Sequence, residues 1–141
     1  SGAFLVYGAN GVIGRYNAYN HEEEQVVIGC RGSIGNVVLT KPKSWITSNA
    51  MVIKPKSPSS VEKSWLFYAI QSTPLRKITG GTSQPQITAK DVNKLVVMIP
   101  SKDEQLKISR LLSQLDERIE RELGALRLLG REKTGYLQSM I

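Results

Sequence analysis

The sequence predicts an α+β fold, in which a small β-rich domain with short helices is followed by one long α-helix that forms a coiled coil. Two observations predict it. Residues 1–100 contain short β-branched runs that end at Gly, Pro or Ser, as strands commonly do. Residues 101–141 carry apolar side chains in alternating steps of four and three, which is the period of a coiled-coil seam. We therefore expect two parts, residues 1–100 and residues 101–141.

Strands and two short helices account for the first part. The runs VVIG, NVVLT, AMVIK and LVVMIP predict strands at residues 26–29, 36–40, 50–54 and 95–100. Residues 59–73 have the apolar spacing of a helix, with Ser59 or Ser60 as its N-cap. Thr88 and Asp91 have the spacing of a capping box, which predicts a second short helix. Trp45 and Trp65 are expected in the core.

A capping box at Ser101 and Glu104 predicts the start of the long helix. A helix of about 40 residues measures some 60 Å at 1.5 Å per residue, which is too long for a domain of this size to cover. We therefore expect its apolar stripe to pack against another helix, and Leu115→Asp to break that pairing. The predicted interface residues are Ile108, Leu112, Leu115, Ile119, Leu126, Leu129 and Tyr136, with Glu122 and Lys133 as polar interruptions of the stripe.

The composition excludes several classes of protein. The chain has 141 residues, of which 40% are hydrophobic, so it is unlike a disordered chain. It shows neither an apolar run long enough to span a membrane nor a signal peptide, and its single cysteine, Cys30, is consistent with a reducing cytoplasm. Residues 1–100 carry 11 Lys and Arg against 5 Asp and Glu. This positive excess suits a phosphate backbone, with a merely solvated basic surface as the alternative.

The stretch FLVYGANGVIGR, residues 4–15, has the glycine spacing of a dinucleotide-binding fingerprint. That fingerprint needs a helix after the glycines and an acidic residue about 20 positions later. The residues after Arg15 have no apolar helix face, and GCRGSIG, residues 29–35, stands where the acid is needed. GANGVIG and GCRGSIG share the pattern Gly-x-x-Gly-x-Ile-Gly, so we expect two glycine turns that feed consecutive strands, and no cofactor.

No catalytic or metal-binding residue is predicted. His21 is the only histidine, and nothing near it in the sequence would orient it as a base for a Cys30 nucleophile. The run HEEE, residues 21–24, has no ordered spacing of metal ligands. An exposed acidic turn and a buried cysteine are therefore expected.

The string GTSQPQIT, residues 81–88, followed by DVNKLVVMIPSKDEQLKISRLLSQLDERI, residues 91–119, closely resembles the specificity subunit of type I restriction–modification systems. In that family a Gly-x-Ser-Gln-x-x-Ile loop leads to a short strand, an Ile-Pro pair and a Glu-Gln-x-x-Ile motif that opens a long helix. GVIGRY, IGCRGSIGNV, WITSNAMVI and the tail KTGYLQSMI are also similar to that family, so the resemblance covers nearly the whole chain. The motif residues are Gly81, Ser83, Gln84, Ile87, Ile99, Pro100, Glu104, Gln105 and Ile108.

The resemblance implies that residues 1–100 are a target-recognition domain for double-stranded DNA and that residues 101–141 are a spacer helix. It implies a non-catalytic chain that directs methyltransferase (modification) and endonuclease (restriction) subunits. The chain departs from the family pattern because it has one recognition unit instead of two. The family's usual opening is also missing before the first residue, so the recognition domain is expected to be partial. A two-fold homodimer with paired helices would restore the two-domain layout.

Residues expected at the DNA are basic, aromatic, hydroxyl-bearing or amide-bearing. Glutamine amides suit adenine edges, and hydroxyls suit phosphates. For Ser83 and Gln84, a role in folding the loop is favoured over base reading. Tyr16 either contacts DNA or packs against the sheet. The complete set is Arg15, Tyr16, Arg31, Lys41, Lys43, Arg76, Lys77, Thr82, Ser83, Gln84 and Gln86.

Two other functions compete with sequence-specific recognition. One is a non-catalytic coiled-coil assembly module, whose helix holds partner proteins and whose DNA contact is non-specific. The other is a nucleotide-cofactor enzyme, which the missing helix after the first glycine turn disfavours. Selection from a random duplex library separates the first two, and a thermal-shift assay with the cofactor tests the third.

Overall fold

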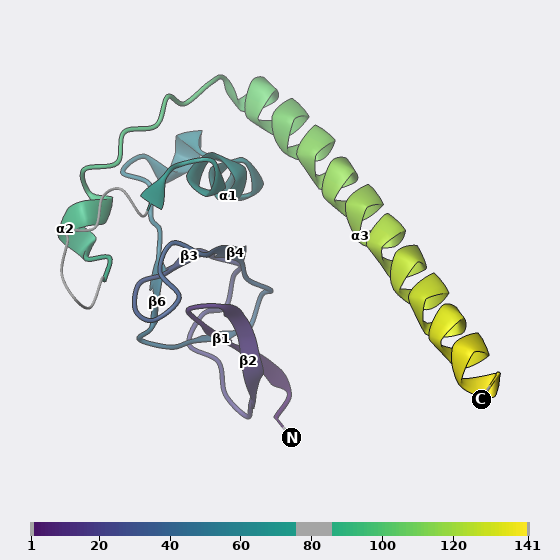
Figure 1. Cartoon of the computed structure of the whole chain (residues 1–141). Helices are drawn as coiled ribbons and strands as arrows, with labels where there is room; N and C mark the ends of the chain where they lie inside the picture. The colour runs from purple at the N-terminus through teal and green to yellow at the C-terminus, as the bar shows by residue number, and fades with distance from the viewer. Residues whose placement is uncertain (1, 76–85, 141) are drawn as a thin grey trace. The chain divides into compact units, whose positions relative to one another are not determined.

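The computed structural model describes residues 2–75 and 86–140 (Figure 1). The chain divides into two units, Ser1–Leu106 and Lys107–Ile141. Within the described residues, the first unit holds all the strands, the two short helices and the first turn of the long helix. The second unit is the rest of that helix. The functional boundary expected between residues 100 and 101 stays a prediction.

One sheet is built on the first glycine turn. Strands β1 (Phe4–Gly8) and β2 (Gly11–Tyr16) form an antiparallel hairpin, and β5 (Trp45–Ile46) pairs in parallel with β1. The strand order is therefore β2-β1-β5, which places β2 at an edge. All residues of β2 after Gly11 are exposed, because one face of this small sheet has little to pack against.

The second sheet confirms three of the predicted strands, one with the expected bounds and two in shortened form. Strand β3 (Val26–Gly29) lies in the centre, with β4 (Val37–Leu39) and β6 (Ala50–Val52) antiparallel on either side. All four residues of β3 are buried, which explains why its sequence is an unbroken apolar run.

The core lies between the second sheet and α1 (Lys63–Gln71), which packs against β3 and β4. Trp65 is buried there, as expected, and Ile87, near the end of the string GTSQPQIT, joins the same cluster. Trp45 is only half-buried, so its expected place in the core is wrong. Its ring instead meets the ring of Tyr16 edge-on, with centroids 5.2 Å apart, on the partly covered first sheet.

The predicted N-cap of α1 is also wrong. The helix begins at Lys63, and the residue in the cap position, Glu62, makes no side-chain capping hydrogen bond. The Ser60 hydroxyl donates instead to the Ser57 carbonyl, 2.9 Å away, and closes the 3₁₀ turn η1 (Pro58–Ser60). Val61 then adopts an extended backbone and is buried, so the chain leaves the turn before the helix starts.

The run LVVMIP does not form a strand. Residues 95–100 have no strand assignment. A strand needs a neighbour with which to exchange hydrogen bonds, and the described residues supply none beside this segment.

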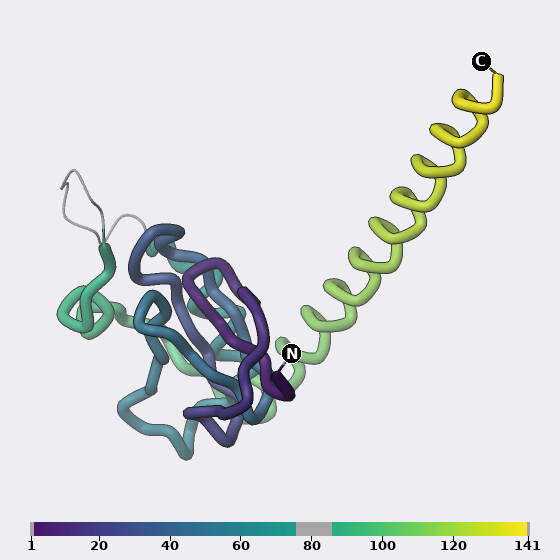
Figure 2. Tube along the Cα trace, turned by 90° about the horizontal axis from the view of Figure 1, so that it is seen from below, coloured from purple at the N-terminus to yellow at the C-terminus, as the bar shows by residue number. Residues whose placement is uncertain are grey.

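Both predicted capping boxes are confirmed. At α2 (Ala89–Val92), the Asp91 carboxylate accepts from the Thr88 backbone N–H at 3.0 Å, and the Thr88 hydroxyl accepts from the Asp91 N–H at 3.3 Å. Ser101 and Glu104 repeat the pattern at the start of α3 (Lys102–Ser139), where the backbone N–H of Ser101 lies 3.0 Å from the Glu104 carboxylate. Figure 2 shows α3 as one continuous helix without a kink.

Candidate nucleic-acid interface

The two glycine turns lie against each other. A side chain at Gly29 would overlap the backbone oxygens of Ala9 and Ser33, so only glycine allows this approach. The side-chain amide of Asn36 donates to the Ala9 carbonyl at 3.5 Å, a long hydrogen bond between the same two turns. The tip of the β1–β2 hairpin and the turn at residues 29–35 therefore share one edge of the domain.

Ile87, near the end of the string GTSQPQIT, contacts the turn at residues 29–35. The backbone N–H of Ile87 donates to the Cys30 carbonyl at 3.0 Å, and the buried Ile87 side chain holds that contact. Its neighbour Gln86 is exposed, as is Arg31, the neighbour of Cys30. We use the name turn cluster for Ala9, residues 29–35 and residues 86–87.

Backbone conformation supports the reading of these segments as turns. Gly11 has a φ of 96° and Gly32 a φ of 75°, and the two hold the same position in the repeated glycine pattern. After Gly14 the chain continues as strand β2 and not as a helix. The strand–turn–helix arrangement that a dinucleotide site requires is therefore not formed at residues 4–15.

Arg15 and Tyr16 lie at the far end of β2 from the turn cluster. They pair with Leu5 and Phe4, whereas the hairpin tip pairs Gly8 with Gly11. Four residues of strand separate Gly11 from Arg15, or roughly 13 Å at about 3.3 Å per residue. The Tyr16 side chain is 51% exposed even though it contacts Trp45. Both expectations for Tyr16 are thus compatible with its position, since one ring edge packs and the rest faces solvent.

Lys41 and Lys43 follow β4 and precede β5. The backbone N–H of Lys41 donates to the hydroxyl of buried Tyr7 at 3.0 Å, so the sheet fixes the start of this loop. Lys43 has a φ of 51°, which is uncommon outside glycine. Its ammonium lies 3.7 Å from the Glu22 carboxylate, and both side chains are more than half exposed.

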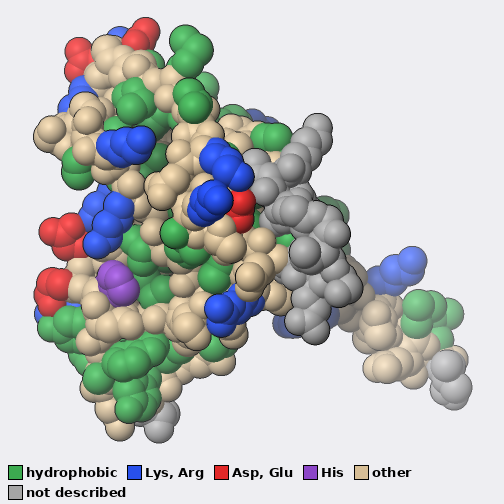
Figure 3. Space-filling model, turned by 90° about the vertical axis from the view of Figure 1, so that its left-hand side faces the viewer, with side chains coloured by type: hydrophobic (Ala, Val, Ile, Leu, Met, Phe, Trp, Pro, Cys, Tyr) green, Lys and Arg blue, Asp and Glu red, His purple; other side chains and the backbone are tan. Residues whose placement is uncertain are grey.

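The acidic run therefore offsets part of the basic charge. Besides Glu22 with Lys43, the Glu23 carboxylate accepts from the Lys63 ammonium at 2.6 Å, and this hydrogen bond lowers the pKa of Glu23. Within residues 2–75 and 86–140, neither Arg31 nor Lys41 has a carboxylate in ion-pair distance. Figure 3 shows Lys and Arg side chains spread between exposed hydrophobic ones on one face, without a single continuous basic stripe.

Five of the expected DNA contacts cannot be placed on this surface. Those that lie outside the described residues are Arg76, Lys77, Thr82, Ser83 and Gln84. The structure brings Arg31 and Gln86 together in the turn cluster, whereas Arg15 and Tyr16 lie along β2 and Lys41 and Lys43 in the β4–β5 loop.

His21 and Cys30 each contact a different neighbouring group. The His21 ring nitrogen Nδ1 lies 2.7 Å from the Asn20 side-chain oxygen, and burial together with the Lys54 charge lowers the pKa of His21. The buried Cys30 thiol contacts the Ser48 carbonyl at 3.6 Å. In the described part of the chain, no three His, Cys, Asp or Glu side chains gather into a possible metal site.

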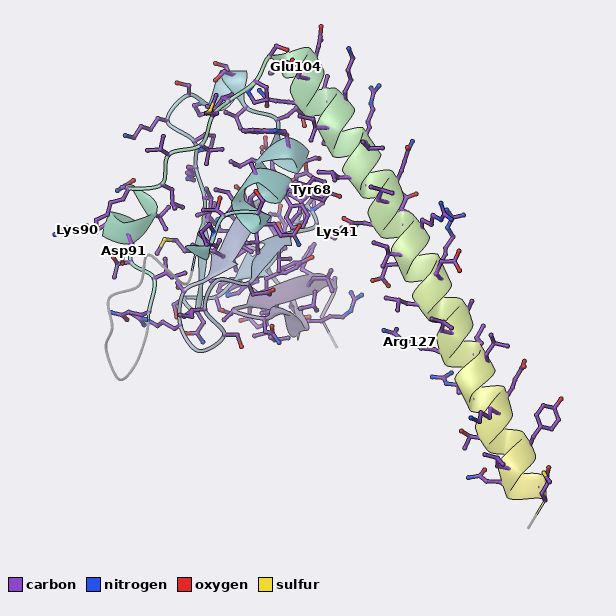
Figure 4. All side chains as sticks on the ribbon, turned by 45° about the horizontal axis from the view of Figure 1, so that its top comes forward. Lys41, Tyr68, Lys90, Asp91, Glu104 and Arg127 are labelled. Carbon is purple, nitrogen blue, oxygen red and sulfur yellow. The ribbon has the colours of Figure 1, made fainter. Side chains whose placement is uncertain are left out.

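The second unit presents a long apolar surface. The predicted interface residues from Leu115 onward are exposed; Leu126, for example, is 62% exposed and Tyr136 is 72% exposed. Ile108 is also exposed, and Leu112 is partly buried. The sequence pattern placed Glu122 in the stripe as a polar interruption. Leu123, four residues after Ile119, is also exposed and extends the apolar stripe. Charged side chains such as Arg127 project from the same helix (Figure 4). No helix among the described residues has the length and apolar character to cross a membrane.

Gln105, in the Glu-Gln pair at the start of α3, has a structural role that the sequence did not predict. Glu104 closes the capping box (Figure 4). The Gln105 side chain is fully buried, and its amide oxygen accepts from the Glu62 N–H at 2.7 Å. Its amide nitrogen donates to the carbonyls of Ser60 and Pro100, each 2.9 Å away. Gln105 thus joins the start of α3 to residues 60–62, more than 40 positions earlier in the sequence, and to the nearby Pro100.

Comparison with known proteins gives a consistent result. The sequence model of the family described as type I restriction modification DNA specificity domain matches residues 3–126. The chain is 25% identical over 111 residues to the type I restriction enzyme EcoprrI specificity subunit of Escherichia coli, covering 78% of this chain and 27% of that protein. The chain therefore spans about a quarter of this curated relative's length.

Two solved structures share the fold. The type I restriction–modification S subunit from M. genitalium superposes with a TM-score of 0.73 at 23% identity, over 86% of this chain and 33% of that one. A chain from a structure of type I R-M complex assembly and conformational transition gives a TM-score of 0.57 at 18% identity, over 85% and 32% of the two chains.

Proposed function

The chain belongs to the type I restriction modification DNA specificity domain family, and from this premise we propose that it recognises a specific double-stranded DNA sequence as part of a specificity subunit. In this proposal the chain is not itself catalytic. It directs methyltransferase and endonuclease subunits, which carry out the chemistry on DNA. A protein that acts on DNA in this way works in the cytoplasm.

The turn cluster carries the proposal. Three segments that are distant in sequence meet there. The hydrogen bond between Ile87 and Cys30 joins two of them, and the residues next to this pair, Arg31 and Gln86, are exposed. Arginine reads guanine edges bidentately and glutamine reads adenine edges, so these two groups suit direct readout in the major groove. Rigid anchoring by Gly29 and Ile87 would hold them without a large ordering cost.

The remaining basic residues suit a backbone-positioning role. Arg15 comes from strand β2, and Lys41 and Lys43 come from the β4–β5 loop. Arg76 and Lys77 precede the string GTSQPQIT in the sequence. Phosphate contacts orient a protein on the duplex and carry no sequence information of their own. Lys43 contributes most to phosphate binding when DNA displaces the Glu22 carboxylate from its ammonium group.

The apolar stripe of α3 is proposed to pack against a second helix of the same kind. The stripe has the period of a coiled-coil seam, and a two-fold homodimer buries the same residues on both chains. Two recognition domains would then read the two halves of a split, palindromic site.

Selection from a random duplex library tests the proposal. The 141-residue chain is incubated with the library at moderate salt, and the retained DNA is sequenced. We expect enrichment of a short motif, with two copies at fixed spacing if the chain dimerises. Arg31→Ala should relax the motif at one position, whereas Lys102→Ala, an exposed lysine outside the proposed surface, should leave it unchanged.

Other outcomes contradict the proposal in different ways. Salt-sensitive retention without a motif would leave only phosphate binding. Absence of retention at low salt, with a folded and dimeric protein, would favour the assembly-module alternative.

A further inference from the structure

The segment Leu95–Ile99 has the side-chain pattern of a strand although it is not paired. Leu95 and Val97 pack on the hydrophobic core. Val96 and Met98 point away from it and are 94% and 92% exposed. Such alternation has the two-residue period of a half-buried strand. Exposure of both Val96 and Met98 to water is unfavourable, because burial of their apolar surface would lower the free energy.

The backbone of this segment lacks strand partners. Within residues 2–75 and 86–140, the backbone groups of Val96–Ile99 make no hydrogen bond to another backbone group. Among the described residues, its backbone is bonded at the two ends, where the Leu95 N–H donates to Val92 and the Pro100 carbonyl accepts from Gln105. An extended, apolar segment whose N–H and C=O groups have no backbone partner among the described residues is a template for another strand.

A groove lies directly beside the segment. A cavity of about 280 Å³ is bounded by Val96, Val97 and Ile99 on one side and by core residues such as Val61 and Trp65 on the other. Lys54 and Lys56 also border it. Within the described residues, no carboxylate forms an ion pair with either lysine.

We propose that Leu95–Ile99 and this groove dock an extended polypeptide strand that is not among the 141 residues, and that the strand alternates apolar side chains with carboxylates. The free backbone groups call for a polypeptide, because only another backbone satisfies a row of alternating donors and acceptors. Val96, Met98 and Ile99 call for apolar side chains, and Lys54 and Lys56 for acidic ones. This surface is separate from the turn cluster and from the stripe of α3, so the inference goes beyond the proposed DNA recognition.

A displayed library of random ten-residue peptides, selected on the 141-residue chain, tests the inference. We expect the enriched peptides to alternate apolar residues with Asp or Glu. Binding of the best peptide, measured by fluorescence anisotropy, should fall at least tenfold for Val96→Asp/Met98→Asp and for Lys54→Glu/Lys56→Glu. N-methylation of alternate peptide residues should abolish binding in one of the two possible sets, the one whose N–H groups face the segment.

The controls separate a local loss from a global one. Val12→Asp/Ile13→Asp places the same two charges on exposed hydrophobic positions of β2 and should bind the peptide like the parent chain. Thermal melting checks that each variant is folded, and the lysine pair supplies a second route if the apolar pair destabilises the domain.

Three results would overturn the inference. One is a failure of any peptide family to enrich. Another is enrichment of peptides with helical spacing, or binding that survives all the variants. The third is a homodimer that Met98→Asp dissociates, which would assign the segment to a second copy of this chain.

Discussion

The two units of this chain differ in how much of their apolar surface is buried. In Ser1–Leu106, β3 and α1 bury residues such as Ile28 and Trp65 within the unit. In Lys107–Ile141, the apolar residues from Leu115 to Met140 are exposed along one helix. The first unit thus contains its own core, whereas a single helix has none and gains hydrophobic stabilisation only by packing against another surface.

The hydrogen bonds differ in the same way. The first unit contains contacts between residues far apart in sequence, such as Gln105 with Glu62 and Ile87 with Cys30. Side-chain hydrogen bonds along the second unit reach back three or four residues, as from Thr134 to Gly130. Specific tertiary contacts fix a unique shape, while a helix with only local bonds gains its order from what it packs against.

The largest effect is expected from Leu115→Asp, which tests whether the stripe needs a partner. A charge buried in an apolar helix interface costs roughly 3 kcal/mol or more, equivalent to over 100-fold in association. Light scattering at micromolar concentration should therefore report a dimer for the parent chain and a monomer for the variant. Gln114→Asp, an outward position on the same helix, is the matched control. A variant that keeps the dimer mass would show that the stripe is not the interface.

Gln105→Ala tests the tertiary contacts of the first unit. It leaves the Glu62 N–H and the Ser60 and Pro100 carbonyls without their partner. Buried groups left unsatisfied cost about 1 to 3 kcal/mol each, so a loss of roughly 3 kcal/mol in the free energy of unfolding is expected. Urea denaturation measures it, with Gln114→Ala as the exposed control. A loss below about 0.5 kcal/mol, the range of ordinary surface substitutions, would remove Gln105 from this role.

Gly29→Ala tests the approach of the two glycine turns. The new methyl group would meet the backbone of Ala9 and Ser33, which have to move. Overpacking of this kind costs about 1 to 3 kcal/mol, and the displaced hairpin tip should also weaken DNA retention. Gly14→Ala is the matched control, because no atom lies within 4 Å of the added group. Equal stability of the two variants would mean that the turns are not tightly joined.

Arg31→Ala tests the proposed surface by its charge. If Arg31 reads a guanine base, its loss should weaken DNA binding by about 1 to 3 kcal/mol. If Arg31 contacts phosphate, binding weakens equally for all sequences. The slope of log K against the logarithm of the salt concentration then becomes smaller in magnitude by about one. Titrations at several salt concentrations separate these cases. Unchanged binding at every salt concentration would remove Arg31 from the interface.

The smallest effect concerns the cap of α2. Hydrogen bonds from the Thr88 hydroxyl and backbone N–H lower the pKa of Asp91. A depressed folded-state pKa stabilises the fold above the pKa of the unfolded chain, and this contribution disappears as the pH falls through the folded-state value. Asp91→Asn should therefore unfold at lower urea concentration than the parent chain at pH 7, with the difference shrinking toward about pH 3. A difference independent of pH would mean that the carboxylate charge contributes nothing to the cap.

Local features of the fold were predictable from the sequence because their causes are local. The capping boxes at Thr88 and Ser101 involve residues three apart, and the long helix follows from a repeat that spans a few turns. The buried strand β3 was visible as an unbroken apolar run. The glycine turns were also visible, since the repeated spacing predicts positive φ, which Gly11 and Gly32 adopt.

Other features depended on partners distant in the chain. LVVMIP has the composition of a strand, but strand formation requires a neighbour that the described residues do not provide. Ser60 looks like an N-cap, but a separate turn uses its hydroxyl. Tryptophan at position 45 was expected in the core, but it lies on a sheet that is covered incompletely.

The sequence by itself determined the two-part α+β layout, the long apolar stripe and the list of basic and amide residues suited to DNA. The tertiary structure alone decided which of them meet. It joined Cys30 and Ile87, the neighbours of Arg31 and Gln86, by a hydrogen bond, tied Gln105 to residues 60–62 and left Val96 and Met98 exposed. The reason is physical: repeats and caps act over a few residues, whereas a surface is made by packing between segments whose distance along the chain no local pattern encodes.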